Sequence, residues 1–149
     1  MGKSSLSVEL ATDTKKDAIA GLVQPVISHY FEGLNAGDFE ATSQLFAVDG
    51  ALQPPFEDAV IGPTAIADYL EREAKGFLLQ PQQTVSKPLE DGDTEVEVVG
   101  KVQTPWFAVN VRWTFILSST QQILIAKINL LAALQDLLHL KNNQQPAEM

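Results

Sequence analysis

The stretch from 104 to 117 constrains the fold of this chain more than any other part of the sequence. Its alternate residues form an unbroken apolar row of Phe107, Val109, Val111, Trp113, Phe115 and Leu117. The residues between them are mixed in polarity, and they include Asn110, Arg112 and Thr114. Strict alternation over this length is typical of a β-strand that buries one face. The stretch therefore predicts a long strand in a sheet with one dry face.

Both tryptophans of the chain, Trp106 and Trp113, lie in this stretch. Because an odd number of positions separates them, a regular strand directs their side chains to opposite faces. One indole is therefore expected in a core or cavity, and the other at a rim or a partner. An indole has a single N–H donor, which needs a hydrogen-bond partner when the ring is buried. Where these two N–H groups point is the main functional question that the sequence raises.

The rest of the chain predicts helices first and long strands afterwards. A helical pattern covers about 15–35, with a break or kink expected at Pro25, and shorter helices are expected at 39–46 and 63–76. Short strands are expected at 50–56 and 59–62, and long ones at 78–89, 95–104, 104–117 and 122–132, with turns at 91–93 and 118–120. This order is typical of an α+β domain in which N-terminal helices cover a curved antiparallel β-sheet. An apolar ligand would fit in the cone between the helices and the sheet.

Length, charge and cysteine content limit the functions that are open to the chain. Its 149 residues fit one domain, which we place at 14–141 between polar tails at 1–13 and 142–149, with a short amphipathic helix at 134–140. The formal charge of −9 argues against nucleic acid or an anionic membrane surface as an electrostatic partner. The chain has no cysteine, so disulfides, thiol nucleophiles and thiolate metal sites are excluded. Together with the lack of a secretory apolar region near Met1, this favours a cytoplasmic location.

Several motifs resemble known families. Residues 28–39 (SHYFEGLNAGDF), with 45–47 (LFA) and 49–51 (DGA), are similar to the opening of the nuclear transport factor two-like superfamily. Residues 51–56 (ALQPPF) and 100–107 (GKVQTPWF) resemble the C-terminal domain of the cyanobacterial orange carotenoid protein family and its stand-alone homologues. The resemblance extends over about 22–141. It implies the cone-shaped fold of that superfamily.

The resemblance also implies a binding site for a ketocarotenoid of the canthaxanthin or echinenone type, without a metal. Members of the family bind the carbonyl of one terminal ring through a tyrosine and a tryptophan, which match Tyr30 and Trp113 here. Trp106 and Glu73 match residues at the interface with a helical domain. The expected lining of the ligand cavity comprises Leu34, Phe77, Leu79, Trp106, Phe107, Phe115 and Ile128. The residue pattern agrees with these roles, because Tyr30 lies on an apolar helix stripe and Trp113 on the dry strand row.

The chain departs from the family pattern in two places. A short insert that relatives have between the two tryptophans is absent, which shortens the hairpin and would reshape the cavity mouth. Near the end of the domain, Asn129 replaces a usual aspartate and Lys127 a small residue. These differences bear on local geometry and ligand choice more than on the fold.

The function implied is that of a water-soluble carotenoid-binding protein that carries and transfers pigment and gives photoprotection by quenching singlet oxygen or excited states. A rigid polyene is about as long as such a domain is wide, so half of it protrudes and needs cover. A second copy around a two-fold axis is the simplest cover, and the resemblance implies the same homodimer. It further implies pigment exchange with helical carotenoid proteins or, through transient contact, with membranes.

Two other functions remain open on this scaffold. Ketosteroid isomerases have an oxyanion tyrosine that matches Tyr30, but their catalytic carboxylate falls where this chain has Gln53, Pro54 and Pro55. Neither an amide nor a proline can abstract a proton at neutral pH, so we expect no enzyme activity. The other alternative is a ligand-free protein that only dimerises, as fold alone does not determine function.

Overall fold

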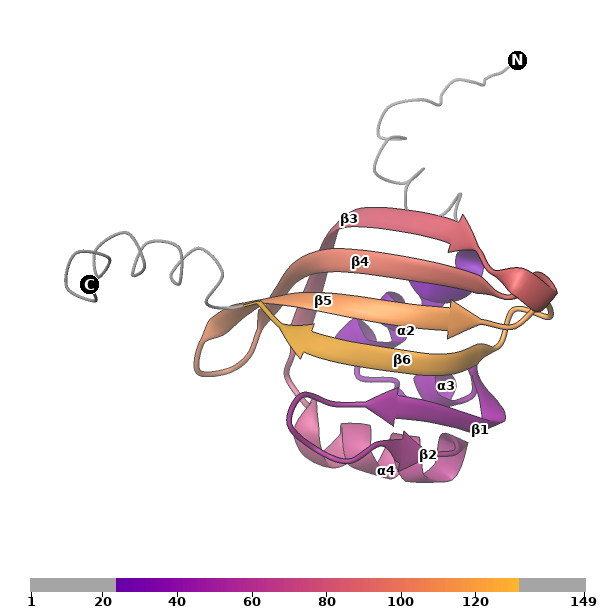
Figure 1. Ribbon diagram of the computed structural model, residues 1–149. Coiled ribbons are helices and arrows are strands. Elements are labelled where there is room, and N and C mark those ends of the chain that lie inside the picture. The colour runs from indigo at the N-terminus through magenta and orange to yellow at the C-terminus, as the bar shows by residue number, and fades with distance from the viewer. Residues whose placement is uncertain (1–23, 132–149) are drawn as a thin grey trace, which may run out of the picture.

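In the computed structural model, which describes residues 24–131, three α-helices cover one face of a six-stranded sheet (Figure 1). The helices are α2 (Pro25–Ala36), α3 (Phe39–Ser43) and α4 (Pro63–Glu73). The strands are β1 (Phe46–Gln53), β2 (Val60–Ile61), β3 (Leu78–Pro88), β4 (Thr94–Gln103), β5 (Ala108–Leu117) and β6 (Ile123–Leu130). The predicted α+β class, with helices on one face of a curved sheet, is confirmed. The predicted tails, the helical pattern before residue 24 and the helix at 134–140 lie outside the described residues.

One turn ends the first described helix and begins the next. Pro25 is at the start of α2, where the N–H that proline lacks has no helical partner. The helix ends at Gly37, which has φ 77° and donates its N–H to the Leu34 carbonyl at 3.1 Å. Asp38 then caps α3, since its carboxylate accepts the Ala41 N–H at 3.1 Å.

The sheet has the spatial order β2-β1-β6-β5-β4-β3. The four long strands, β3 to β6, pair antiparallel as predicted. The pairing of β1 with β6 is parallel, which was not predicted. The predicted second helix ran to Phe46, but this residue begins β1 and pairs with Ile123 of β6. A short apolar run suits a helix or a strand equally well, so pairing with a remote strand decides the outcome.

The tryptophan strand β5 lies between β4 and β6. Its inward row is buried: Val111, Trp113, Phe115 and Leu117 are each at most 1% exposed. The strand begins at Ala108 rather than at 104, because the Thr104 hydroxyl accepts the N–H groups of Trp106 at 3.1 Å and Phe107 at 3.0 Å. These bonds make residues 104–107 a tight turn. Trp106 therefore lies at the tip of the β4–β5 hairpin, where its side chain is 80% exposed.

The sheet is curved toward the helices, and a side-chain clamp holds its edge. The β3–β4 register shifts between Pro81 and Gln83, opposite Gly100, where an added Cβ would overlap the Gln80 carbonyl. Such a bulge bends the strand and strengthens its twist. At the same edge, the Asn35 amide donates to the Leu79 carbonyl at 2.9 Å and accepts the Leu79 N–H at 2.6 Å. This clamp ties the end of α2 to β3, so the space between the helices and the sheet keeps a defined width.

Within residues 24–131, no helix has the length and apolar content needed to cross a membrane.

Candidate functional site

A cavity of about 270 Å³ lies between the helices and the concave face of the sheet. Its walls are formed by α2, α4, β1 with the segment that follows it, and strands β3 to β6. Most of the lining is aliphatic or aromatic, including Leu34, Leu52, Leu70, Phe77, Leu79, Val102, Val109, Val111, Ile128 and Leu130. The predicted cone between helices and sheet therefore contains an apolar cavity in the structure.

Two buried aromatic donors contribute to the deep wall of this cavity. Tyr30 comes from the buried face of α2 and Trp113 from the inward row of β5, and each is 1% exposed. Phe31 packs edge-to-face between them, with ring centroids 5.3 Å from Tyr30 and 4.8 Å from Trp113. Among residues 24–131, no hydrogen-bond partner contacts the Tyr30 hydroxyl or the Trp113 indole N–H. Both residues line the cavity.

The protonation state of Tyr30 makes its hydroxyl a donor. Burial raises the pKa of the Tyr30 phenol well above its ordinary value of about 10, because the phenolate loses its hydration. The phenol is therefore neutral at physiological pH, and the indole N–H of Trp113 can only donate. Two donors in apolar surroundings favour a ligand that presents an oxygen acceptor without a charge, such as a carbonyl.

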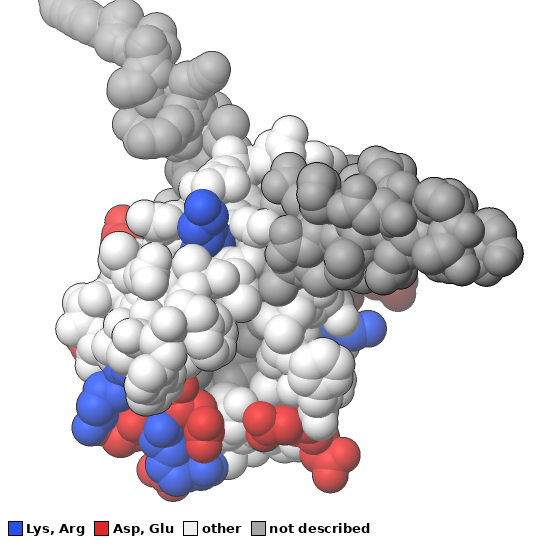
Figure 2. Space-filling view, turned by 90° about the vertical axis from the view of Figure 1, so that its left-hand side faces the viewer, with Lys and Arg blue, Asp and Glu red and all other residues white. Residues whose placement is uncertain are grey.

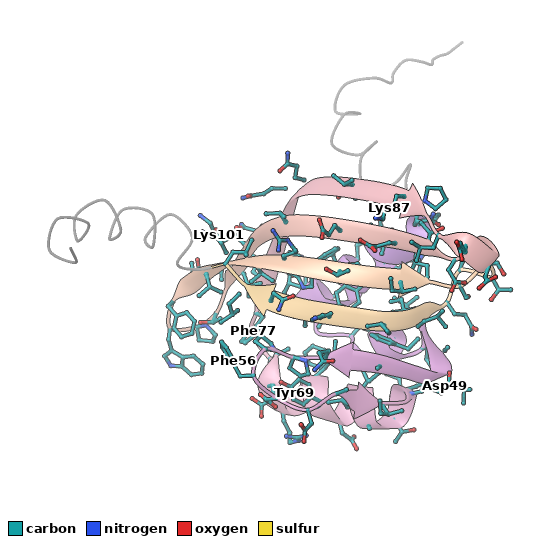
Figure 3. The ribbon with its side chains drawn as sticks, in the orientation of Figure 1. Asp49, Phe56, Tyr69, Phe77, Lys87 and Lys101 are labelled. Carbon is teal, nitrogen blue, oxygen red and sulfur yellow. The ribbon has the colours of Figure 1, made fainter. Side chains whose placement is uncertain are left out.

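The rim of the cavity is more polar than its deep wall. The Tyr69 hydroxyl lies 3.2 Å from a Glu57 carboxylate oxygen, and Arg72 lies over the Tyr69 ring, 5.6 Å from its centroid. Arg72 also contacts the Glu73 carboxylate at 3.5 Å. Figure 3 labels Tyr69 beside Phe56 and Phe77, at the end of the sheet where β4 turns into β5. Tyr69 was not among the site residues that the sequence predicted.

Burial, followed by the charges and hydrogen bond of Glu57 and then Glu73, raises the pKa of Tyr69 to about 12. Tyr30 and Tyr69 are the only tyrosines of the whole chain. We therefore expect the 295 nm absorbance of the folded protein to stay flat as the pH rises through 10, the midpoint for an unfolded chain. Because both pKa values are higher in the folded protein than in the unfolded chain, the neutral phenols stabilise the folded state fully below about pH 10. This stabilisation is lost as the pH rises toward 12.

The control for this titration is the same protein in denaturant, which should titrate both phenols near pH 10. In Tyr69→Phe, the absorbance change that remains should come from Tyr30 and appear only when the protein unfolds. A folded-state curve that coincided with the denatured one would contradict the burial of Tyr30 and the contact of Tyr69 with Glu57.

The structure places the predicted lining residues in two groups. Leu34, Phe77, Leu79, Phe107 and Ile128 line the cavity together with Tyr30 and Trp113. Phe115 does not line it, because the Tyr30 ring lies across it with centroids 4.9 Å apart and covers it. Trp106 does not line it either, because the 104–107 turn directs its side chain outward. Glu73 lies at the rim with its side chain 51% exposed.

Exposed aromatic side chains surround the rim. Phe56, Trp106 and Phe107 are 93%, 80% and 56% exposed, and they come from the two segments that supply Pro54, Pro55 and Thr104 to the cavity wall. Figure 2 shows this end of the molecule: uncharged residues cover most of the face, and charged residues of both signs gather along its lower edge, where α4 lies. Exposed aromatic side chains beside a cavity mouth, as Phe56, Trp106 and Phe107 are here, are typical of sites that bind ligands or partners.

No protein-family model matches the chain. Among curated proteins, it is 39% identical over 136 residues to the orange carotenoid-binding protein of Limnospira maxima, covering 89% of this chain and 43% of that protein. It is 38% identical over 128 residues to the orange carotenoid-binding protein of Synechocystis sp., covering 83% of this chain and 40% of that protein. The chain thus spans about two fifths of the relatives that it matches.

Solved structures show the same relationship. The orange carotenoid protein of Anabaena (Nostoc) sp., solved binding canthaxanthin, superposes with a TM-score of 0.71 at 41% identity, over 76% of this chain and 38% of that one. A nuclear transport factor two-like protein of unknown function from Cytophaga hutchinsonii superposes with a TM-score of 0.58 at 12% identity, over 70% of this chain and 86% of that one. The second similarity concerns the fold alone, and it agrees with the predicted cone-shaped α+β fold.

Proposed function

This chain is a homologue of the C-terminal domain of the orange carotenoid-binding proteins, and on that premise we propose that its cavity binds one terminal ring of a ketocarotenoid. The observation that carries the proposal is the pair of buried donors, Tyr30 and Trp113, in the wall of a single apolar cavity. A ring carbonyl supplies the one acceptor that both donors can share. The relative that was solved binding canthaxanthin supports this ligand class.

The binding energy would come mainly from the apolar lining. Each Å² of apolar ligand surface that leaves water contributes about 25 cal/mol, and a carotenoid ring is almost wholly apolar. Each hydrogen bond to the carbonyl adds only about 1 kcal/mol, because it replaces a bond to water. The donors therefore act mainly on selectivity: a ring without a carbonyl leaves both of them buried and without an acceptor.

A carotenoid bound in this way extends far beyond the cavity. Pockets for whole drug-sized ligands have about 300–1,000 Å³, whereas this cavity has about 270 Å³, so the polyene would lie outside it. The exposed rim of Phe56, Trp106 and Phe107 offers apolar surface to that polyene. We propose that a second copy of the chain covers the remainder, with Trp106 and Glu73 at the interface. Exchange of pigment with helical carotenoid proteins or membranes would then need only the opening of this dimer.

The proposed role is pigment carriage with photoprotective quenching, and no enzymatic step is proposed. The carboxylate that lines the described cavity, Glu73, lies at the rim and contacts Arg72. Pro54 and Pro55 line the wall at the stretch where an isomerase has its base, and neither has a group that accepts a proton.

Coexpression with the enzymes of canthaxanthin synthesis tests the proposal. We expect the purified protein to be coloured, with an absorption band shifted to the red of canthaxanthin in organic solvent, because two donors to the carbonyl polarise the conjugated system. Tyr30→Phe and Trp113→Phe should each reduce the shift. Colourless wild-type protein would overturn the carrier proposal, and isomerisation of an unsaturated steroid ketone would favour the enzyme instead.

A further inference from the structure

The cavity has the dimensions of a single ring rather than of a carotenoid. An engineered apolar cavity of about 150 Å³ holds benzene, whereas pockets for drug-sized ligands begin at about 300 Å³. The cavity here, at about 270 Å³, lies between these limits and fits one six-membered ring with several methyl groups. The walls near its donors are closely packed, because Tyr30 and Trp113 both contact Phe31 edge-to-face.

The residues that would recognise a carbonyl both line this small volume. Tyr30 and Trp113 line it, and their burial keeps water from competing for the same acceptor. The polar groups at the rim are already engaged with each other, since the Tyr69 hydroxyl is bonded to Glu57 and Glu73 contacts Arg72. Nothing in the lining requires a conjugated chain beyond the ring.

We propose that the site also binds small monocyclic ketones as complete ligands, in particular methyl-substituted cyclohexenones of the size of a carotenoid end ring without its polyene. This rests on the proposed carbonyl site and extends it to a second class of ligand. Such a ketone fills the cavity, shares its oxygen between Tyr30 and Trp113, and leaves the aromatic rim uncovered. It therefore competes with the carotenoid ring for the cavity.

The two tryptophans allow a direct test by NMR. In ¹⁵N-labelled ligand-free protein, each tryptophan gives one indole N–H signal, and a Trp106→Phe variant assigns them. Titration with isophorone (3,5,5-trimethylcyclohex-2-enone) should shift the Trp113 signal, because its N–H gains an acceptor. The Trp106 signal should stay in place, since that side chain is 80% exposed and outside the cavity lining.

Two comparisons make the test specific to the carbonyl. A trimethylcyclohexene without oxygen should bind about tenfold or more weakly, because it leaves both donors without an acceptor. Tyr30→Phe, which removes one hydroxyl without changing the ring, should weaken isophorone binding by about three- to tenfold while the Trp113 signal still shifts. Equal affinity for ketone and hydrocarbon, or equal shifts of both indole signals, would overturn the inference.

Canthaxanthin-loaded protein separates this inference from the proposed function. If the loaded protein forms and its Trp113 signal is shifted, but isophorone shifts nothing up to its solubility limit, the inference fails and the carrier function stands. If isophorone binds but no loaded protein forms, the carrier function fails and the small-ketone site stands. If neither ligand binds, both are wrong.

Discussion

Offered canthaxanthin and β-carotene together, the protein is expected to take up canthaxanthin in preference by roughly 30-fold to 10⁴-fold. β-Carotene has the same rings without the carbonyl, so the Tyr30 and Trp113 donors would both be buried without an acceptor. Each such group costs about 1–3 kcal/mol, or about 2–6 kcal/mol for the pair, and 1.4 kcal/mol is a factor of ten. The ratio of the two pigments in the purified protein, measured by chromatography after extraction, gives the preference directly.

Two tyrosine variants sharpen this measurement. Tyr30→Phe removes one donor and should lower the canthaxanthin preference by about five- to 100-fold. In this variant, bound β-carotene leaves only the indole N–H without an acceptor, instead of two donors. Tyr69→Phe is the matched control: it removes a hydroxyl that is bonded to Glu57 at the rim, and the preference should not change. Because the ratio compares two ligands in one protein, a general loss of pigment binding does not affect it. If Tyr30→Phe kept the full preference, Tyr30 would not be the carbonyl donor.

The second large effect is on stability. Trp113→Ala should lower the free energy of unfolding by about 3–5 kcal/mol, because it removes the largest fully buried side chain from the centre of the sheet. The indole packs edge-to-face on Phe31 and lies between Val98 and Ile128 on the neighbouring strands. Domains of this size are stable by only about 5–15 kcal/mol, so the change is a large fraction of the total.

The other tryptophan supplies the control for this experiment. Trp106→Ala makes the same chemical change at a side chain that is 80% exposed, and the unfolding free energy should move by no more than about 0.5 kcal/mol. Urea unfolding of the ligand-free variants, followed by far-ultraviolet circular dichroism, does not depend on either indole as a reporter. Similar losses for the two variants would contradict the assignment of Trp113 to the core and of Trp106 to the surface.

Taken together, the two experiments separate the two roles of Trp113. Its ring packs in the core, and its N–H is the group that we propose binds the ligand carbonyl in the cavity that Trp113 lines. Trp113→Phe keeps an aromatic ring in the core but lacks the N–H. It should therefore remove the same donor as Trp113→Ala with a smaller loss of stability, so a fall in the pigment preference of Trp113→Phe would show that recognition depends on the donor and not only on the packing.

Much of the fold could be predicted because its signals are local. The alternation from Val109 to Leu117 and the helix stripe that contains Tyr30 each follow from a period in the chain, and these periods determine which side of an element is buried. The ends of several elements are also local: Pro25 begins a helix, and Gly37 with Asp38 ends one and starts the next. The buried positions of Tyr30 and Trp113 were therefore predictable before any coordinates.

Other features depended on contacts between distant parts of the chain. Phe46 belongs to a strand because β6, far along the sequence, pairs with it in parallel. Phe115 and Trp113 lie on the same inward row of β5. The Tyr30 ring packs against Phe115, however, whereas Trp113 lines the cavity. The apolar periodicity of a sequence assigns a residue to one face of its strand or helix, but it does not determine which neighbouring side chain covers that residue.

The sequence alone determined which side chains face inward and which chemical groups they carry, because periodicity and residue type are properties of the chain itself. Only the tertiary structure decided that Tyr30 and Trp113 share one cavity of about 270 Å³, that Tyr69 and Glu57 meet at its rim, and that Phe115 lies behind its wall. The volume and lining of a cavity depend on the distance between packed layers, and that distance is set by the side chains of both layers together.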